Sequence, residues 1–166
     1  MLCDRVIGHL DDPDVLPASG KRSTVLDLTW LQCHSRTYKK VLEDGRTIRL
    51  LLPPGTVLQH GDVVSDDGGE VIWINLLPCE LLIVDTSNAP AIGPLMYEIG
   101  NLHAPLEMLP TGFATNPDGP VEAVLRKYKT PFRTEIRRFH PLQLPNGESF
   151  RLAPTFSISR PASTAK

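Results

Sequence analysis

Residues 79–103, which read CELLIVDTSNAPAIGPLMYEIGNLH, contain the change of pattern that decides the fold. Residues 81–84 form a continuous apolar run, which is typical of a buried β-strand. From residue 92 onward apolar side chains recur at helical spacing, and Pro94 is tolerated because it falls in the first turn. The apolar face of this expected helix consists of Ile92, Leu95, Met96, Ile99 and Leu102. We therefore expect a strand followed by a helix, which Pro105 stops.

The residues downstream predict two further strands, a second helix and a final strand. Short strands are expected at residues 106–109 and 113–115. Asp118 is positioned to cap the second helix, with Pro120 in its first turn. The apolar face of that helix consists of Val121, Val124, Leu125 and Tyr128. With a last strand at residues 130–139, the order is β-α-β-β-α-β, that of ferredoxin-like domains, in which two helices cover one face of a four-stranded antiparallel sheet.

The residues upstream read as short strands separated by turns. Leu26, Leu28 and Trp30 alternate along residues 25–30, which indicates a half-buried strand. Strands at 36–42 and 47–52 flank the turn Glu43-Asp44-Gly45, and a second hairpin has its tip at residues 66–69. The fold class is therefore α+β. We expect an all-β domain at residues 1–78, a ferredoxin-like domain at 79–145 and a flexible tail at 146–166.

Charge and composition exclude several classes of function. The 166 residues include 17 Lys and Arg against 19 Asp and Glu, a net charge of -2, so the basic excess of a protein that binds nucleic acid or anionic membranes is lacking. The chain begins with no apolar signal segment, and its three cysteines form no disulfide framework, so we expect a cytoplasmic protein without a membrane span. Nucleophile, P-loop and zinc-protease motifs are absent, so we expect no enzyme.

His103 is the first candidate for chemistry, because it stands at the end of the expected first helix. A histidine there often caps the helix end, where the dipole favours a positive ring, or is satisfied within the core. One imidazole is too few for a metal site, but a two-fold axis near His103 would bring two copies together. His140 is either a solvated polar residue or a group that a mobile segment brings over another site. His9, His34 and His60 lack partners at ligand spacing.

The segment Met96-Tyr97-Glu98-Ile99-Gly100-Asn101-Leu102-His103 resembles the Tyr-x-(Leu/Ile)-Gly-Asn-Arg-His stretch of the UreE urease accessory proteins, a family of nickel metallochaperones. Residues 43–46, 50–55 and 58–64 also follow one another as the corresponding segments of that family do. The resemblance covers about residues 5–140. It implies an N-terminal β domain that binds peptides or partners, followed by a ferredoxin-like domain that binds nickel and dimerises.

Carried over to this sequence, the resemblance implies that His103 of each subunit binds Ni(II) at the dimer interface, a site that Zn(II) or Cu(II) would also fit. The urease accessory GTPase and the apo-urease assembly complex would be the partners. Two departures stand out: no histidine follows His140, which makes His140 the one remaining candidate for a tail ligand, and Leu102 replaces the usual arginine.

Two other classes of function remain open. A metal-independent adaptor would present an edge strand of the β domain to a client and use the ferredoxin-like domain only to dimerise. A small RNA-binding module would need aromatic side chains on its central strands and a basic patch, and neither the residues 106–109 nor the charge balance supplies them.

Overall fold

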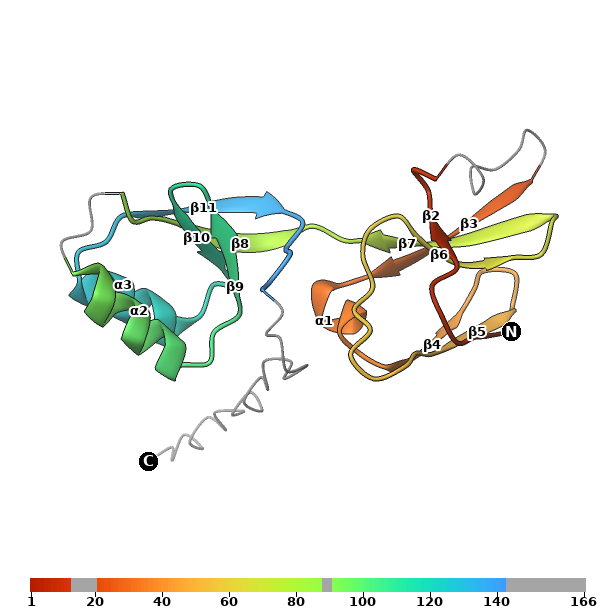
Figure 1. The fold of residues 1–166 in the computed structure, drawn as a ribbon, viewed down its shortest axis with the longest axis horizontal. Coiled ribbons are helices and arrows are strands. Elements are labelled where there is room, and N and C mark those ends of the chain that lie inside the picture. Colours follow the sequence, from red (N-terminus) through yellow and green to blue (C-terminus); the bar gives the residue numbers. More distant parts are fainter. Residues whose placement is uncertain (13–20, 88–90, 143–166) are drawn as a thin grey trace, which may run out of the picture.

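The computed structural model describes residues 1–12, 21–87 and 91–142 (Figure 1). The tail expected at residues 146–166 lies outside the described residues. An N-terminal β unit and a C-terminal α+β unit are joined where β7 runs into β8 (Figure 1). The predicted α+β fold class is confirmed.

The N-terminal unit contains two small sheets. One has the order β1-β5-β4 and the other β2-β6-β7-β3. Both predicted hairpins are present, with β4 antiparallel to β5 and β6 antiparallel to β7, whereas the parallel pairs β1–β5 and β3–β7 had no signal in the sequence. The strands are β1 Leu2–Cys3, β2 Gly8–His9, β3 Arg22–Leu28, β4 Thr37–Val41, β5 Thr47–Leu51, β6 Asp62–Asp66 and β7 Glu70–Leu76.

Trp30 does not continue the strand that contains Leu26 and Leu28, as we had expected. Strand β3 ends at Leu28, and Trp30 begins the short helix α1, Trp30–Cys33. Thr29 caps this helix: its hydroxyl accepts from the Gln32 amide, while the Gln32 side chain accepts from the Thr29 amide at 2.9 Å. This reciprocal capping box outweighs the alternating pattern, although Trp30 still packs against the core that contains Leu26 and Leu28.

The C-terminal unit has the predicted ferredoxin-like topology. Its elements are β8 Cys79–Asp85, α2 Ile92–Asn101, β9 Leu106–Leu109, β10 Gly112–Thr115, α3 Gly119–Lys127 and β11 Phe132–Arg137. The sheet has the order β11-β8-β10-β9, and all three neighbouring pairs are antiparallel. Helices α2 and α3 lie side by side on one face of this sheet (Figure 1).

The helices bury narrower faces than the sequence predicts. Leu95 and Ile99 are fully buried against the sheet, but Ile92 and Leu102 at the two ends of the predicted stripe are 42% and 39% exposed. Asp118 does precede α3, yet its side chain makes no capping hydrogen bond. The core between helices and sheet consists of Leu82, Val84, Leu95, Ile99, Ala104, Phe113, Val121 and Leu125.

The other face of this sheet is covered by the chain that follows β11. Phe139 is 1% exposed and packs with Leu81, Ile83 and Ala114, which point away from the helices. The Trp30 ring meets the Phe139 ring edge-on at 5.2 Å between centroids. Arg138 donates from Nε to the Leu76 carbonyl at 2.9 Å. These contacts tie the C-terminal unit to the N-terminal unit.

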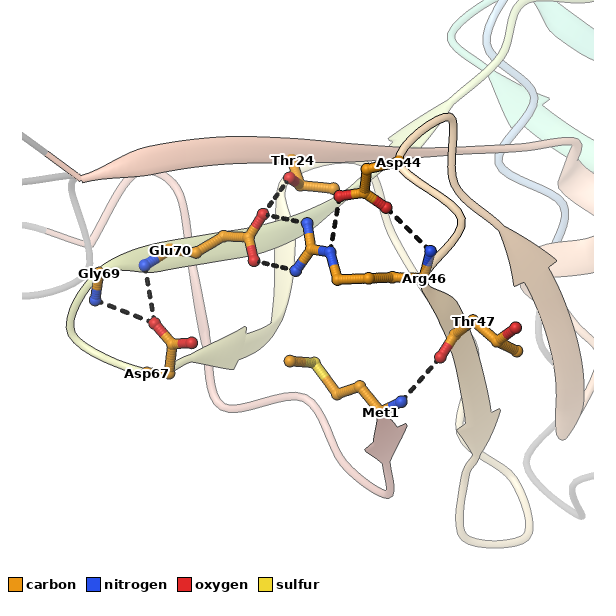
Figure 2. A network of polar contacts seen from close by, with 8 residues as sticks. All are labelled: Met1, Thr24, Asp44, Arg46, Thr47, Asp67, Gly69 and Glu70. Carbon is orange, nitrogen blue, oxygen red and sulfur yellow. Dashed lines mark hydrogen bonds and ion pairs between the residues drawn. The ribbon is translucent and has the colours of Figure 1, made fainter.

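A buried carboxylate connects the two sheets of the N-terminal unit (Figure 2). Glu70 is 8% exposed and accepts from both terminal nitrogens of Arg46, one of them at 2.7 Å, and also from the Thr24 hydroxyl. Arg46 is held in turn by Asp44 at 2.6 Å. The hydrogen bonds from Arg46, and then those from Thr24, lower the pKa of Glu70 to about 2. The β4–β5 turn is thereby fixed to the start of β7.

Replacing Glu70 with Gln should lower the free energy of unfolding by about 2 kcal/mol near neutral pH, because the charged hydrogen bonds are lost. The folded pKa of Glu70 lies below its ordinary value of 4.5, so the contribution is complete above that pH and disappears as the pH falls toward about 2. Urea denaturation of both proteins should show their difference shrinking over this range.

The control is Glu135→Gln, which breaks an exposed pair with Arg133 at 3.3 Å. Exposed pairs contribute little, so this variant should unfold like the wild type at every pH. A stability difference between wild type and E70Q that stays constant down to acidic pH would contradict the role assigned to Glu70.

Candidate metal centre

His103 is exposed at the end of α2, in a backbone conformation that few residues adopt. Its φ is 54°, in the left-handed region, and it directly follows Leu102, the last residue with right-handed helical geometry. The His103 amide donates to the Gly100 carbonyl at 3.0 Å, as in a helix-ending turn. Glycine is the usual residue at this position, since a side chain costs about 1–2 kcal/mol there.

The end of α3 repeats this geometry with a different side chain. Lys129 has a φ of 53°, and its amide donates to the Arg126 carbonyl at 3.1 Å. The chain therefore ends both helices in the same strained way, once with an imidazole and once with an ammonium group. Lys129 thus serves as an internal reference for separating the backbone role of His103 from the chemistry of its ring.

The solvent-exposed face of α2 ends close to His103 in the sequence. Gly93, Tyr97 and Gly100 are spaced four and three residues apart and share one side of the helix. Tyr97 is 71% exposed, and a Cβ added at either glycine would meet no atom within 4 Å. On this face an exposed aromatic ring lies between two glycines without side chains, so another chain can approach the helix closely.

The nearest acidic group on α2 is already engaged. Glu98 accepts from the Lys127 ammonium and from the Tyr128 hydroxyl, both at 2.6 Å. These hydrogen bonds, with Lys127 first, lower the pKa of the Glu98 carboxyl. Glu98 therefore links α2 to α3, and we do not assign it to metal binding.

His140 lies on a different part of the molecule from the solvent face of α2. Its amide donates to Glu107 at 3.0 Å, and the Leu142 amide donates to the Leu106 carbonyl at 2.7 Å. These two hydrogen bonds hold the backbone at residues 140–142 against β9. Its ring lines a cavity that also contains His34 and Trp30.

The remaining soft ligands are dispersed. Within residues 1–12, 21–87 and 91–142, no group of three or more His, Cys, Asp or Glu side chains is arranged to hold a metal ion. Cys3 and Cys33 are buried, whereas Cys79 is only partly buried. His9 is placed by a contact of 2.9 Å between its Nε2 and the His60 carbonyl.

Comparison with known proteins identifies the family. The model of the N-terminal domain of the UreE urease accessory proteins matches residues 3–77. The urease accessory protein UreE of Nostoc sp. is 32% identical over 111 residues, which cover 66% of this chain and 75% of that protein. The chain belongs to the UreE family. The UreE proteins of Acetivibrio thermocellus and Helicobacter bizzozeronii are 24% and 30% identical over 143 and 131 residues, or 92% and 72% of their lengths.

Membership of the UreE family confirms the resemblance seen in the sequence. Its members are named as accessory proteins of urease, so the expectation that this chain is not an enzyme is also confirmed. No helix among the residues that the structure describes is long and apolar enough to cross a membrane. The matched domain model ends at residue 77, before His103, so the assignment of the metal ligands rests on the C-terminal unit alone.

Replacing His103 with Gly tests whether this residue is kept for its backbone or for its ring. Relief of the left-handed strain exceeds the entropy cost of glycine, so H103G should be more stable by about 0.5–1 kcal/mol. Lys129→Gly should gain a similar amount. Thermal and urea unfolding measure both, and a marked loss of stability in H103G alone would instead assign His103 to the fold.

Proposed function

We propose that this UreE protein serves urease maturation as a nickel metallochaperone, and that His103 is its nickel ligand. The family name ties its relatives to urease assembly. The observation that carries the assignment is the exposed, strained histidine at the end of α2. Lys129 shares this backbone conformation, so what sets His103 apart is an exposed imidazole, a side chain that binds nickel.

The site is completed by symmetry. Two chains meet across the face of α2 that carries Gly93, Tyr97 and Gly100, and their His103 side chains together supply two imidazoles to one ion. The last carbonyls of α2 add favourable partial negative charge beside the cation. Water fills the remaining positions of the shell, because His140, the other candidate ligand, lies on a different part of the molecule. Such an open shell of imidazoles holds Ni(II), and also Zn(II) or Cu(II), loosely enough to pass it on.

The partners follow from this role. The homodimer hands its nickel to the urease accessory GTPase and the apo-urease assembly complex in the cytoplasm. The boundary between the two domains lies near residue 78. Residues 1–78 form the β domain that binds partners, and residues 79–145 form the domain that binds metal and dimerises.

A second candidate, the metal-independent adaptor, has one observation in its favour. The sheet β1-β5-β4 exposes apolar side chains on its outer face beside the basic Lys39 and Arg49: Leu2 is 63%, Val41 60% and Leu51 52% exposed. Strand β4 is also an edge strand of this sheet. Client binding that is unchanged by chelators and by loss of His103 would favour the adaptor.

Nickel titration by calorimetry tests the ligand. Wild type should bind one Ni(II) per two chains. Because even a hydrogen-bond partner of a ligand is worth about 10–100-fold in affinity, H103A and H103G should lose about 100-fold or more. K129G, with the same backbone change, should bind like wild type. Unchanged nickel affinity in both His103 variants would overturn the proposal.

Tyr97→Asp tests the dimer. A buried aromatic side chain at the centre of an interface is commonly worth 2 kcal/mol or more, so the dimer dissociation constant should rise by about 30-fold or more. Analytical ultracentrifugation measures this, and nickel affinity should fall in parallel because each ion needs both chains. Val41→Asp, an exposed apolar position on the N-terminal unit, is the control and should remain dimeric.

A further inference from the structure

A cavity of about 270 Å³ lies where the two units meet, and it contains histidines from both. His34 enters from the end of α1, and His140 from the segment that follows β11. Trp30 and Phe139, which join the two units edge to face, form part of its wall. The two imidazoles are 106 positions apart in sequence, and each belongs to a different packed unit.

One nitrogen of the His34 ring is engaged in a hydrogen bond within the N-terminal unit. Its Nδ1 lies 2.8 Å from the Trp30 carbonyl oxygen, which accepts hydrogen bonds and cannot donate them. Nδ1 therefore carries the proton of the neutral ring, and the lone pair is on Nε2. Metal-binding histidines are usually held in this manner, with the second nitrogen donating to a carbonyl or carboxylate. The Trp30 ring meets His34 edge-on at 5.8 Å and restricts its rotation.

His140 is held through its backbone amide, and not through its ring. Its amide donates to Glu107, which also pairs with Arg137 at 2.6 Å. The neighbouring Phe139 is buried, so the backbone at this point is anchored on both sides. The His140 side chain borders the cavity, and residues of the N-terminal unit, His34 among them, form the rest of its lining.

The other groups around the cavity limit what it can bind. Cys33 also borders the cavity, but its side chain is 1% exposed and packs into the core of the N-terminal unit. No acidic side chain is among the lining residues of the described chain.

We propose that His34 and His140 form a second metal site, in which a divalent first-row transition ion is held by two imidazoles and completed by water. The site lies within one chain and is separate from the His103 pair. Two neutral nitrogens hold the ion more weakly than a full shell of protein ligands, and Cu(II) binds best of the series. A bound ion joins α1 to the segment after β11 and so clamps the N-terminal unit against the C-terminal one.

The test is a Cu(II) titration in the H103A background, which removes the proposed dimer site. Calorimetry and quenching of tryptophan fluorescence are followed together, since Trp30 borders the cavity. H103A should keep one Cu(II) site per chain with strong quenching. In H103A/H34F and H103A/H140A the affinity of that site should fall by about tenfold or more. The phenylalanine in H34F preserves the aromatic contact with Trp30.

The matched control is H103A/H9Q, which removes a histidine that does not line the cavity and should bind and quench like H103A. The proposal is overturned if copper does not quench the fluorescence of H103A. It is also overturned if H103A/H34F binds copper as tightly as H103A. The proposed function is judged separately, because it depends on nickel affinity in H103A against wild type. In an otherwise wild-type protein, His34→Phe should leave the nickel site at His103 intact.

Discussion

The continuous apolar run of β8 is the constraint on which the arrangement of this chain depends. Leu82 and Val84 face the helices, while Leu81 and Ile83 point the other way, and all four are almost completely buried. A sheet that is apolar on both faces needs two covers. Helices α2 and α3 supply one. The second is assembled from Phe139 and from Trp30 of the N-terminal unit, so covering β8 is also what fastens the two units together.

The position of His103 follows from the same packing. Leu95 and Ile99 are the residues of α2 that pack against the sheet. The opposite side of the helix, which carries Gly93, Tyr97 and Gly100, is therefore left in solvent. The turn that ends the helix then puts the next residue in a left-handed conformation. Burial of one face thus defines the exposed face and the strained terminus beside it, where an imidazole is available to a second chain.

Local patterns in the sequence predicted most of the fold, and the exceptions have physical causes. Periodicity and turn residues located both hairpins and the β-α-β-β-α-β order. Trp30 was misassigned because alternation carries no information about a capping box between Thr29 and Gln32. His103 was found through a local motif. The approach of His34 to His140 was not, because it depends on how Phe139 folds back over the sheet, a contact between segments that no local pattern encodes.

The two histidine sites would respond to different states of the protein. A site made from His103 of two chains exists only in the dimer, so its occupancy depends on protein concentration as well as on metal. A site made from His34 and His140 exists only while α1 and the segment after β11 are in place, so its occupancy depends on the contact between units. Since both proposed sites use neutral imidazoles, protons compete with the metal at both. Acidification therefore releases the ion from either site, while dilution empties only the one that two chains share.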